Sequence, residues 1–215
     1  MSLNVLLPKN AKQIFIPVRV GNLDCLVLSP INIPTSKLDY PTGVAIIFHP
    51  NPLEGGTYTN KIVQTIAKAL NNKGYLCYCP NLRGVGMSNG VHDYGVGEID
   101  DALDIHNYIR QDYPDLPLIL AGFSFGTAVA SGLAAQIEYK KLILVGPAVT
   151  RFKVIAPNKT KTIVIHGQDD EVISLDSVLK WGEEHNLPII CYPNTGHFFH
   201  GKLVGLQNLL ANFKI

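Results

Sequence analysis

An apolar run that ends in a glycine-flanked serine is the feature that most constrains the fold of this chain. Leu118 to Ala121 form an apolar run that is short enough for a buried strand. The sequence Gly-Phe-Ser-Phe-Gly follows at residues 122–126, and after it come small residues that can form a helix packed closely on a sheet. The pattern therefore predicts a strand, a tight turn and a helix, with Ser124 at the apex of the turn.

The Gly-x-Ser-x-Gly pattern in this context is typical of a nucleophile elbow. Glycines on either side of Ser124 would let the strand and the helix approach closely, and a strained turn would expose the hydroxyl group. The N-terminus of the helix offers free backbone N–H groups and a partial positive charge where an oxyanion would form. In the alternative interpretation, the serine only caps the helix.

The composition indicates a globular protein with a sizeable core. Of the 215 residues, 47% are hydrophobic and 16% are charged, and this length suits one substantial domain. The formal charge is +1 and the sequence holds no basic cluster, which argues against a nucleic-acid partner. The first residues lack the basic start and long apolar core of a signal peptide, and no run is long enough to span a bilayer. We therefore expect a cytoplasmic protein without a membrane partner.

The four cysteines, Cys25, Cys77, Cys79 and Cys191, are scattered along the chain. Three of them lie inside apolar strand-like runs, where a thiol behaves as a small hydrophobe. A metal site needs further ligands at suitable spacing, and the sequence shows none around these cysteines. We expect all four cysteines to be reduced and structural.

Strand-like and helical patterns alternate along the rest of the chain. Two strands, Gln13 to Val20 and Cys25 to Leu28, are expected to form a hairpin that turns at Gly21-Asn22, and a loop is expected from Pro30 to Pro41. Further strands are predicted at residues 44–48, 75–79, 141–145, 162–165 and 189–192, and helices at about residues 60–72, 98–111, 175–185 and 202–213. This alternation predicts an α/β protein, with a mostly parallel sheet covered by helices on both faces, in a single domain. The segment between the strands at 141–145 and 162–165 is too short for a lid domain.

Two later strand ends carry groups that could act together with Ser124. One strand is followed by Asp169 and Asp170, and the other by His197 and His200. The order serine, aspartate, histidine is the one expected when these groups sit on a doubly wound sheet. We choose His197 as the base because it lies in the loop directly after a glycine, and we expect His200 to be a surface or capping residue. General physical arguments alone leave the choice between the two aspartates open.

The sequence favours neither a metal nor a nucleotide cofactor. His49 and His166 also lie at strand ends and could join His197 around a metal, but no carboxylate or cysteine is spaced to complete the ligand set. Gly84 and Gly86 resemble part of a dinucleotide fingerprint, but they lead into further loop residues instead of opening a helix. We therefore expect no cofactor and no metal.

The chain resembles the α/β-hydrolase superfamily over nearly its full length. Within it, the chain is most similar to short, lidless bacterial serine hydrolases that carry HPxPLxGGT, NxRGxGxS, GxSxG, GxxDxxV and GH blocks. The matching blocks here, in the same order, are HPNPLEGGT, NLRGVGMS, GFSFG, GQDDEV and GH. In this family the aspartate of the GxxDxxV block is the triad acid, which implies Asp170, although the block is one residue short if Val172 is its valine and Ile173 fits that place better. The resemblance therefore implies a lidless α/β-hydrolase fold and a triad of Ser124, His197 and Asp170.

An oxyanion hole needs two backbone N–H donors. One is expected from Phe125, the residue after the nucleophile. The other is expected from the loop after the strand at residues 44–48, where two prolines cannot donate and where Asn51 and Leu53 remain. Resemblance to hydrolases in which the residue after a His-Gly pair donates favours Asn51.

Together these features predict a serine hydrolase that cleaves carboxylic esters or thioesters of small acyl groups through an acyl-enzyme. Its small-molecule substrate is expected in a shallow pocket walled by Leu53, Phe125, Phe198 and Phe199. Two alternatives remain: a peptidase or amidase of the same fold, and a non-catalytic interaction module on a hydrolase scaffold. The oligomeric state stays open.

Overall fold

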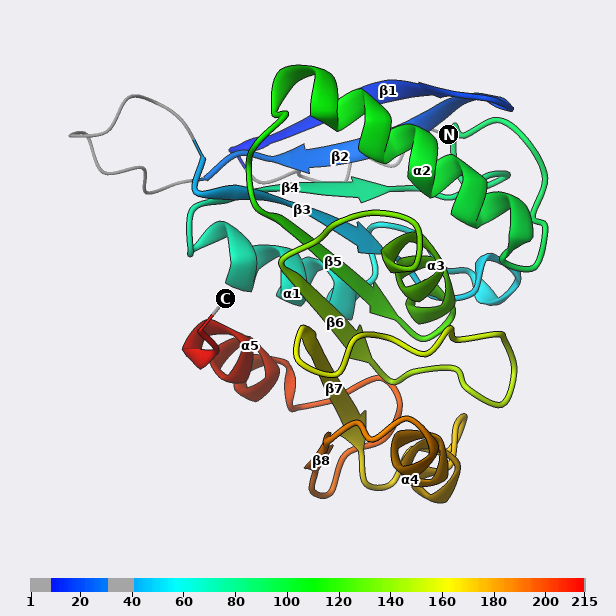
Figure 1. Ribbon diagram of the computed structural model, residues 1–215, viewed down its shortest axis with the longest axis vertical. Helices are drawn as coiled ribbons and strands as arrows, with labels where there is room; N and C mark the ends of the chain where they lie inside the picture. Colours follow the sequence, from blue (N-terminus) through cyan, green and yellow to red (C-terminus); the bar gives the residue numbers. More distant parts are fainter. Residues whose placement is uncertain (1–8, 31–40, 215) are drawn as a thin grey trace.

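The fold is built around one mostly parallel sheet (Figure 1). The structure is a computed structural model, and it describes residues 9–30 and 41–214. The eight strands have the order β1-β2-β4-β3-β5-β6-β7-β8. Strands β3 to β8 run parallel to one another, whereas β1 and β2 form an antiparallel hairpin that pairs with β4 through β2. The sheet expected from the sequence is thereby confirmed. The strands are β1 (Ala11–Val18), β2 (Gly21–Leu28), β3 (Gly43–Phe48), β4 (Tyr75–Pro80), β5 (Leu118–Phe123), β6 (Lys141–Val145), β7 (Thr162–Gly167) and β8 (Ile189–Tyr192).

Helices cover both faces of the sheet. Helices α1 and α5 pack on one face, and α2, α3 and α4 pack on the other (Figure 1). Within the described ranges, no helix has both the length and the apolar character needed to cross a membrane. The helices are α1 (Lys61–Asn71), α2 (Val96–Asp112), α3 (Phe125–Ala134), α4 (Leu175–Glu184) and α5 (Leu203–Asn212), and a short 3-10 turn, η1 (Pro52–Glu54), follows β3.

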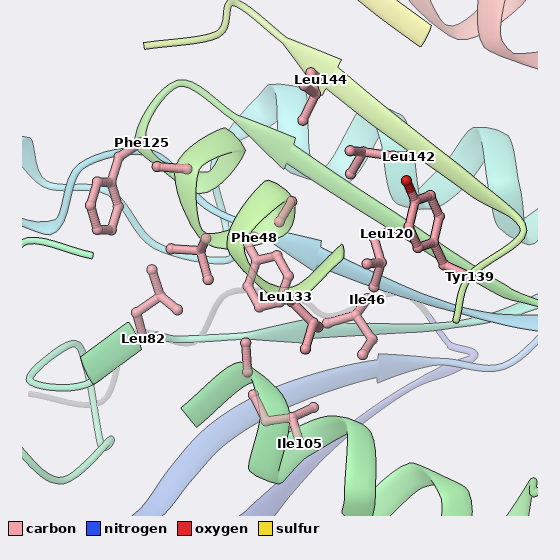
Figure 2. Close-up of a cluster of buried hydrophobic side chains, with 14 of the residues drawn as sticks. Ile46, Phe48, Leu82, Ile105, Leu120, Phe125, Leu133, Tyr139, Leu142 and Leu144 are labelled. Carbon is pink, nitrogen blue, oxygen red and sulfur yellow. The ribbon is translucent and has the colours of Figure 1, made fainter. Parts of the chain in front are cut away.

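An apolar layer on each face holds the sheet in place. Strands β3 and β5 are buried at every position, as expected for strands covered on both faces. Figure 2 shows one layer, in which Ile46 and Leu120 of the sheet gather with Ile105 of α2 and Leu133 of α3. Each such fully buried side chain stabilises the fold by about 1.5–3 kcal/mol. The packing fixes the carboxyl ends of the parallel strands along one edge of the sheet, which is where ligands bind in such folds.

Most element boundaries agree with the predicted ones to within two residues. The N-terminal hairpin differs at its turn, because Val18 pairs with Gly21 and the two turn residues are Arg19 and Val20. Asn22 belongs to β2, where its N–H donates to the side chain of Asn89 at 2.8 Å. That contact comes from a distant loop, so the local pattern could not reveal it. The loop predicted between Pro30 and Pro41 lies outside the described residues.

All four cysteines are free thiols, as the sequence analysis expects. Cys25, Cys77 and Cys79 are buried in the sheet, whereas Cys191 is exposed on β8. Burial raises the pKa of Cys79 to about 12, so its thiol stays protonated at neutral pH.

Candidate active site

Ser124 lies at the turn between β5 and α3, in a backbone conformation that L-residues rarely adopt. Its φ is 52° and its ψ is −118°. The close approach predicted for the flanking glycines is confirmed, because an added Cβ at Gly122 would lie 2.1 Å from the carbonyl oxygen of Gly126. A Cβ at Gly126 would lie 2.2 Å from the carbonyl oxygen of Phe48 at the end of β3. Strand β5, helix α3 and the end of β3 thus meet at distances that exclude any side chain at these two positions.

The side chains of Ser124, His197 and Asp170 form one hydrogen-bonded series. His197 Nε2 lies 3.0 Å from Ser124 Oγ, and His197 Nδ1 lies 2.7 Å from Asp170 Oδ2. All three residues are buried, and they come from the carboxyl ends of β5, β8 and β7. Asp169, the alternative acid, is exposed to solvent. The structure therefore brings Asp170, and not its neighbour, to the imidazole.

Hydrogen bonds fix the charge of Asp170 and the tautomer of His197. Oδ1 of Asp170 accepts from the N–H groups of Val172 at 2.9 Å and Ile173 at 2.8 Å. Burial acts to raise the pKa of Asp170, but the hydrogen bonds from His197 and these amides outweigh it and hold the pKa below its usual value. A carboxylate only accepts, so Nδ1 of His197 carries the ring proton. Its Nε2 is then free to accept the proton of the Ser124 hydroxyl.

Close neighbours hold the imidazole of His197 in place. The backbone N–H of His197 donates to Glu171 Oε2 at 3.1 Å. The ring lies 5.0 Å from the ring of Phe123 and 5.2 Å from that of Phe198, measured between centroids. A Cβ at Gly146 would approach His197 Cε1 to 3.3 Å, so the loop after β6 also limits the ring. These contacts restrict the rotation of the imidazole away from Ser124.

Two backbone N–H groups are the candidate oxyanion donors. One belongs to Phe125 at the start of α3, and the other to Asn51 in the loop after β3. The Phe125 N–H is in the first turn of its helix, where amides lack intrahelical acceptors. The Leu53 N–H is occupied, since it donates to Asn51 Oδ1 at 3.1 Å. Among the described residues, the Asn51 N–H has no hydrogen-bond acceptor. Of the two donors that the sequence leaves open, the geometry thus favours Asn51.

A buried histidine, His49, sets the direction of the Asn51 amide. The Leu82 N–H donates to His49 Nε2 at 2.9 Å, so the proton of this ring is on Nδ1, which donates to the Pro50 carbonyl at 2.7 Å. The peptide is trans, so the Asn51 N–H points opposite to the Pro50 carbonyl and away from His49. Burial lowers the pKa of His49 to about 4, and the ring is neutral at physiological pH. The sequence suggests His49 only as a metal ligand, and its position at a strand end is the one local signal of this role.

His166, the other candidate metal ligand, is also a buried structural group. Its Nε2 lies 2.9 Å from the carbonyl oxygen of Ile173 and donates to it, so the ring helps to hold the loop that carries Asp170. Burial lowers the pKa of His166 despite the nearby Asp170 carboxylate. In the part of the chain that the structure describes, no three His, Cys, Asp or Glu side chains gather in a way that could hold a metal ion.

Two of the four predicted pocket walls are wrong. Phe199 is fully buried, with a φ of 50°, and its ring packs into the apolar layer beneath α1 and α5. The Phe125 ring is also fully buried, between His92 and Phe152. The positive φ of Phe199 turns the chain inward, which a sequence of two adjacent phenylalanines does not reveal.

The other two predicted walls, Leu53 and Phe198, do reach the surface beside the site. Their exposed fractions are 64% and 42%, and the Phe198 ring contacts the ring of His197. His200 is exposed, as predicted for a surface residue. These two apolar side chains are therefore exposed on different loops at the carboxyl edge of the sheet.

A strand-turn-helix elbow at the carboxyl edge of a mostly parallel sheet, with helices on both faces and no lid within residues 9–30 and 41–214, defines an α/β-hydrolase. Residues 46–161 match the family model described as serine aminopeptidase, S33. The chain belongs to this family of the α/β-hydrolase superfamily, and it is a hydrolase.

Solved structures of similar proteins cover almost the whole chain. The lidless α/β serine hydrolase XC6422 from Xanthomonas campestris is 35% identical, with a TM-score of 0.85 over 96% of this chain and 94% of that one. An α/β serine hydrolase homologue from Coxiella burnetii is 30% identical, with a TM-score of 0.82 over 95% of this chain and 98% of that one. Est1E from Butyrivibrio proteoclasticus, 15% identical over 94% of this chain and 96% of that one with a TM-score of 0.74, shares the fold.

A protein of Rickettsia prowazekii, RP471, is similar in sequence to part of the chain. It is 33% identical over 142 residues, which make up 63% of this chain. The matched region spans 60% of the length of that protein.

Proposed function

We propose that this protein is a serine hydrolase that cleaves carboxylic esters or thioesters of small acyl groups through an acyl-enzyme. The observation that carries the proposal is the hydrogen-bonded series from Ser124 Oγ through His197 to Asp170, at 3.0 and 2.7 Å. A serine hydroxyl is a weak nucleophile unless a positioned base takes its proton. Here the base has its acceptor nitrogen toward the hydroxyl and its other nitrogen on an ionised carboxylate.

In the proposed first half-reaction, Ser124 Oγ attacks the acyl carbon while its proton passes to His197 Nε2. The acyl oxygen becomes an oxyanion that accepts hydrogen bonds from the N–H groups of Phe125 and Asn51. Asp170 stabilises the imidazolium that forms. His197 then gives the proton to the leaving alcohol or thiol as its bond to the acyl carbon breaks, and the acyl group stays on Ser124.

In the second half-reaction, water replaces the leaving group. His197 takes a proton from the water as it attacks the acyl carbon, and the same two N–H groups hold the second oxyanion. The proton returns to Ser124 Oγ as the acyl bond breaks, and a carboxylic acid leaves. Removing a single oxyanion donor typically slows such reactions about 10²–10³-fold.

Peptide or amide cleavage is the second candidate, because the matching family is described as serine aminopeptidase. An aminopeptidase needs carboxylates that hold the free amino group of its substrate. Two glutamates beside the site are already engaged: Glu54 pairs with Arg151 at 2.6 Å, and Glu171 accepts from the His197 N–H. This engagement favours the ester or thioester reaction over aminopeptidase activity.

Labelling with a fluorophosphonate probe tests whether the site reacts at all. We expect one adduct, located on Ser124 by peptide mass spectrometry, and no adduct in the Ser124→Ala variant. Wild-type protein that remains unlabelled would favour the non-catalytic module. A panel of p-nitrophenyl acetate, an acetyl thioester and an alanine p-nitroanilide then separates the enzymatic candidates, and turnover of the anilide alone would replace our proposal by the peptidase.

A further inference from the structure

A cleft of about 490 Å³ lies between the loop after β3 and the loop after β4. Residues 52–57 form one wall, and residues 83–92 form the other. The first wall starts directly after Asn51, the candidate oxyanion donor. The second wall includes His92, whose ring lies 5.1 Å from that of Phe125, the other donor residue. The β3–β4 cleft, as we call it, therefore begins next to Asn51 and includes a residue that contacts Phe125, the two residues of the candidate oxyanion hole.

The order of the strands places this cleft on the side of Ser124 that faces away from His197. Ser124 follows β5, and the sheet continues from it in two directions. β3 and β4 lie in one direction, while β6, β7 and β8 lie in the other. Asp170 and His197 follow β7 and β8, whereas the two walls of the cleft follow β3 and β4.

The proposed reaction assigns a different part of the substrate to each direction. In the tetrahedral intermediate the leaving group must face His197 Nε2, because that nitrogen gives it a proton. The oxyanion must face the N–H groups of Asn51 and Phe125. The remaining substituent on the same carbon is the acyl chain, and it extends on the side away from His197.

We infer that the β3–β4 cleft is the acyl subsite and that it takes an unbranched aliphatic chain longer than acetyl. This inference rests on the proposed function. Phe198, on the other side of Ser124, then contacts the leaving group. Acetyl carries a single carbon beyond the acyl carbon, so the cleft distinguishes substrates by the carbons of longer chains.

The side chains that line the cleft suit a neutral aliphatic chain. Leu53, Val85 and Val91 supply apolar surface, and five of the lining residues are glycines that leave the floor open. Val91 is 79% exposed, so a chain that lies on it removes apolar surface from water.

The guanidinium of Arg83 in the cleft is already neutralised. Nε and Nη2 of Arg83 donate to Asp101 at 2.7 and 2.8 Å, and Nη1 lies 3.9 Å from Asp93. An acyl chain that ends in a carboxylate would have to compete with these two aspartates. The occupant that fits is therefore apolar at its end.

The test compares kcat/KM for p-nitrophenyl acetate and p-nitrophenyl hexanoate. Burying one methylene group fully is worth about a fourfold gain, and in this open cleft we expect hexanoate to exceed acetate about tenfold. Val91→Asp should lower the hexanoate-to-acetate ratio at least about fivefold, and Val91→Leu should keep it. Val204→Asp is the matched control, since Val204 is 74% exposed on α5 and does not line the cleft. It should leave the ratio unchanged.

The outcomes separate this inference from the proposed function. If Ser124 is labelled and acetate is hydrolysed, but the ratio is near one or Val91→Asp behaves like Val204→Asp, the assignment of the cleft is wrong and the hydrolase stands. If neither ester is hydrolysed and no label is found, both proposals fall. A crystal structure of the hexylphosphonate adduct on Ser124 gives a direct reading: the chain should lie between residues 52–57 and 83–92, and a chain along Phe198 would overturn the inference.

Discussion

The two sides of Ser124 are built from different chemical parts. Toward β3 and β4, the groups that would meet the substrate oxygen are backbone amides, and a neutral buried histidine and closely packed glycines hold them. Toward β7 and β8, the groups are the side chains of Asp170 and His197, in contact at 2.7 Å. In the proposed reaction, the first side presents fixed dipoles and the second side moves a proton.

This difference would let one small site be both rigid and reactive in the proposed reaction. Fixed N–H groups stabilise developing charge without reorganising during the reaction. The proton carrier must instead change its charge in every half-reaction, and an ionised Asp170 makes that change less costly. Substitutions on the two sides should therefore act in different ways, on proton transfer in one case and on geometry and stability in the other.

Ser124→Ala removes the group that joins the two sides, and we expect the largest effect from it. Loss of a triad nucleophile typically lowers kcat about 10⁶-fold. One hydroxyl contributes little to packing, so the melting temperature should stay close to that of the wild type. Steady-state hydrolysis and thermal unfolding measure the two quantities. Hydrolysis at the wild-type rate would mean that another group is the nucleophile.

Asp170→Asn tests the proton-transfer side. An amide can donate to His197 Nδ1 and so stabilise the wrong tautomer, for which a loss of about 10⁴-fold in kcat is typical. The exposed neighbour offers a matched control, and Asp169→Asn should keep nearly full activity. If the two variants lost activity equally, Asp169 would share the role that we give to Asp170.

Gly126→Ala tests the close packing on the side of the site toward β3 and β4. The new Cβ would meet the Phe48 carbonyl at 2.2 Å, so the end of β3 or the start of α3 must move. We expect a loss of about 3 kcal/mol in the free energy of unfolding, as overpacking typically causes. Gly201→Ala is the control, because its Cβ would meet no atom within 4 Å and only the positive φ of 71° acts against it. Urea unfolding of both variants compares the losses, and equal losses would contradict the packing argument.

His49, on the side of the site toward β3 and β4, makes the stability of the fold sensitive to acid. Its pKa is about 4 in the folded protein, and an unfolded histidine has a pKa near 6.5. As pH falls through this window, the unfolded chain binds a proton that the folded chain does not, so stability is complete above about pH 6.5 and is lost as pH approaches 4. Between pH 7 and pH 5 this amounts to about 2 kcal/mol.

Unfolding free energies at several pH values measure this slope. His49→Gln should flatten it, whatever its effect on absolute stability, whereas His200→Gln on the surface should keep the wild-type slope. A His49→Gln protein with an unchanged slope would show that other groups cause the acid sensitivity.

The strands and the chemical groups could be predicted from the sequence because each leaves a local signal. The apolar run at Leu118 and its glycines define the elbow, and the chain order of serine, aspartate and histidine locates the partners. What could not be predicted depends on contacts between distant segments. The hairpin turn is shifted by Asn89, 67 residues away in sequence from Asn22.

Residues next to one another were the hardest to separate. Phe198 reaches the surface and Phe199 fills the core, because one left-handed residue reverses the direction of the side chain. Asp169 is exposed and Asp170 is buried, and local chemistry gives no preference between the two carboxylates. The role of His49 depends on the Leu82 amide, which the loop after β4 supplies and not the strand that His49 follows.

The backbone of Ser124 has a thermodynamic consequence of its own. A non-glycine residue at a φ of 52° costs the native state about 1–3 kcal/mol, and alanine at this position keeps that penalty. Ser124→Gly would relieve it and should melt at a higher temperature than Ser124→Ala, although both are inert. Glycine would therefore be the more stable choice at this turn, and the strain of the serine is the stability that the proposed reaction would cost the fold.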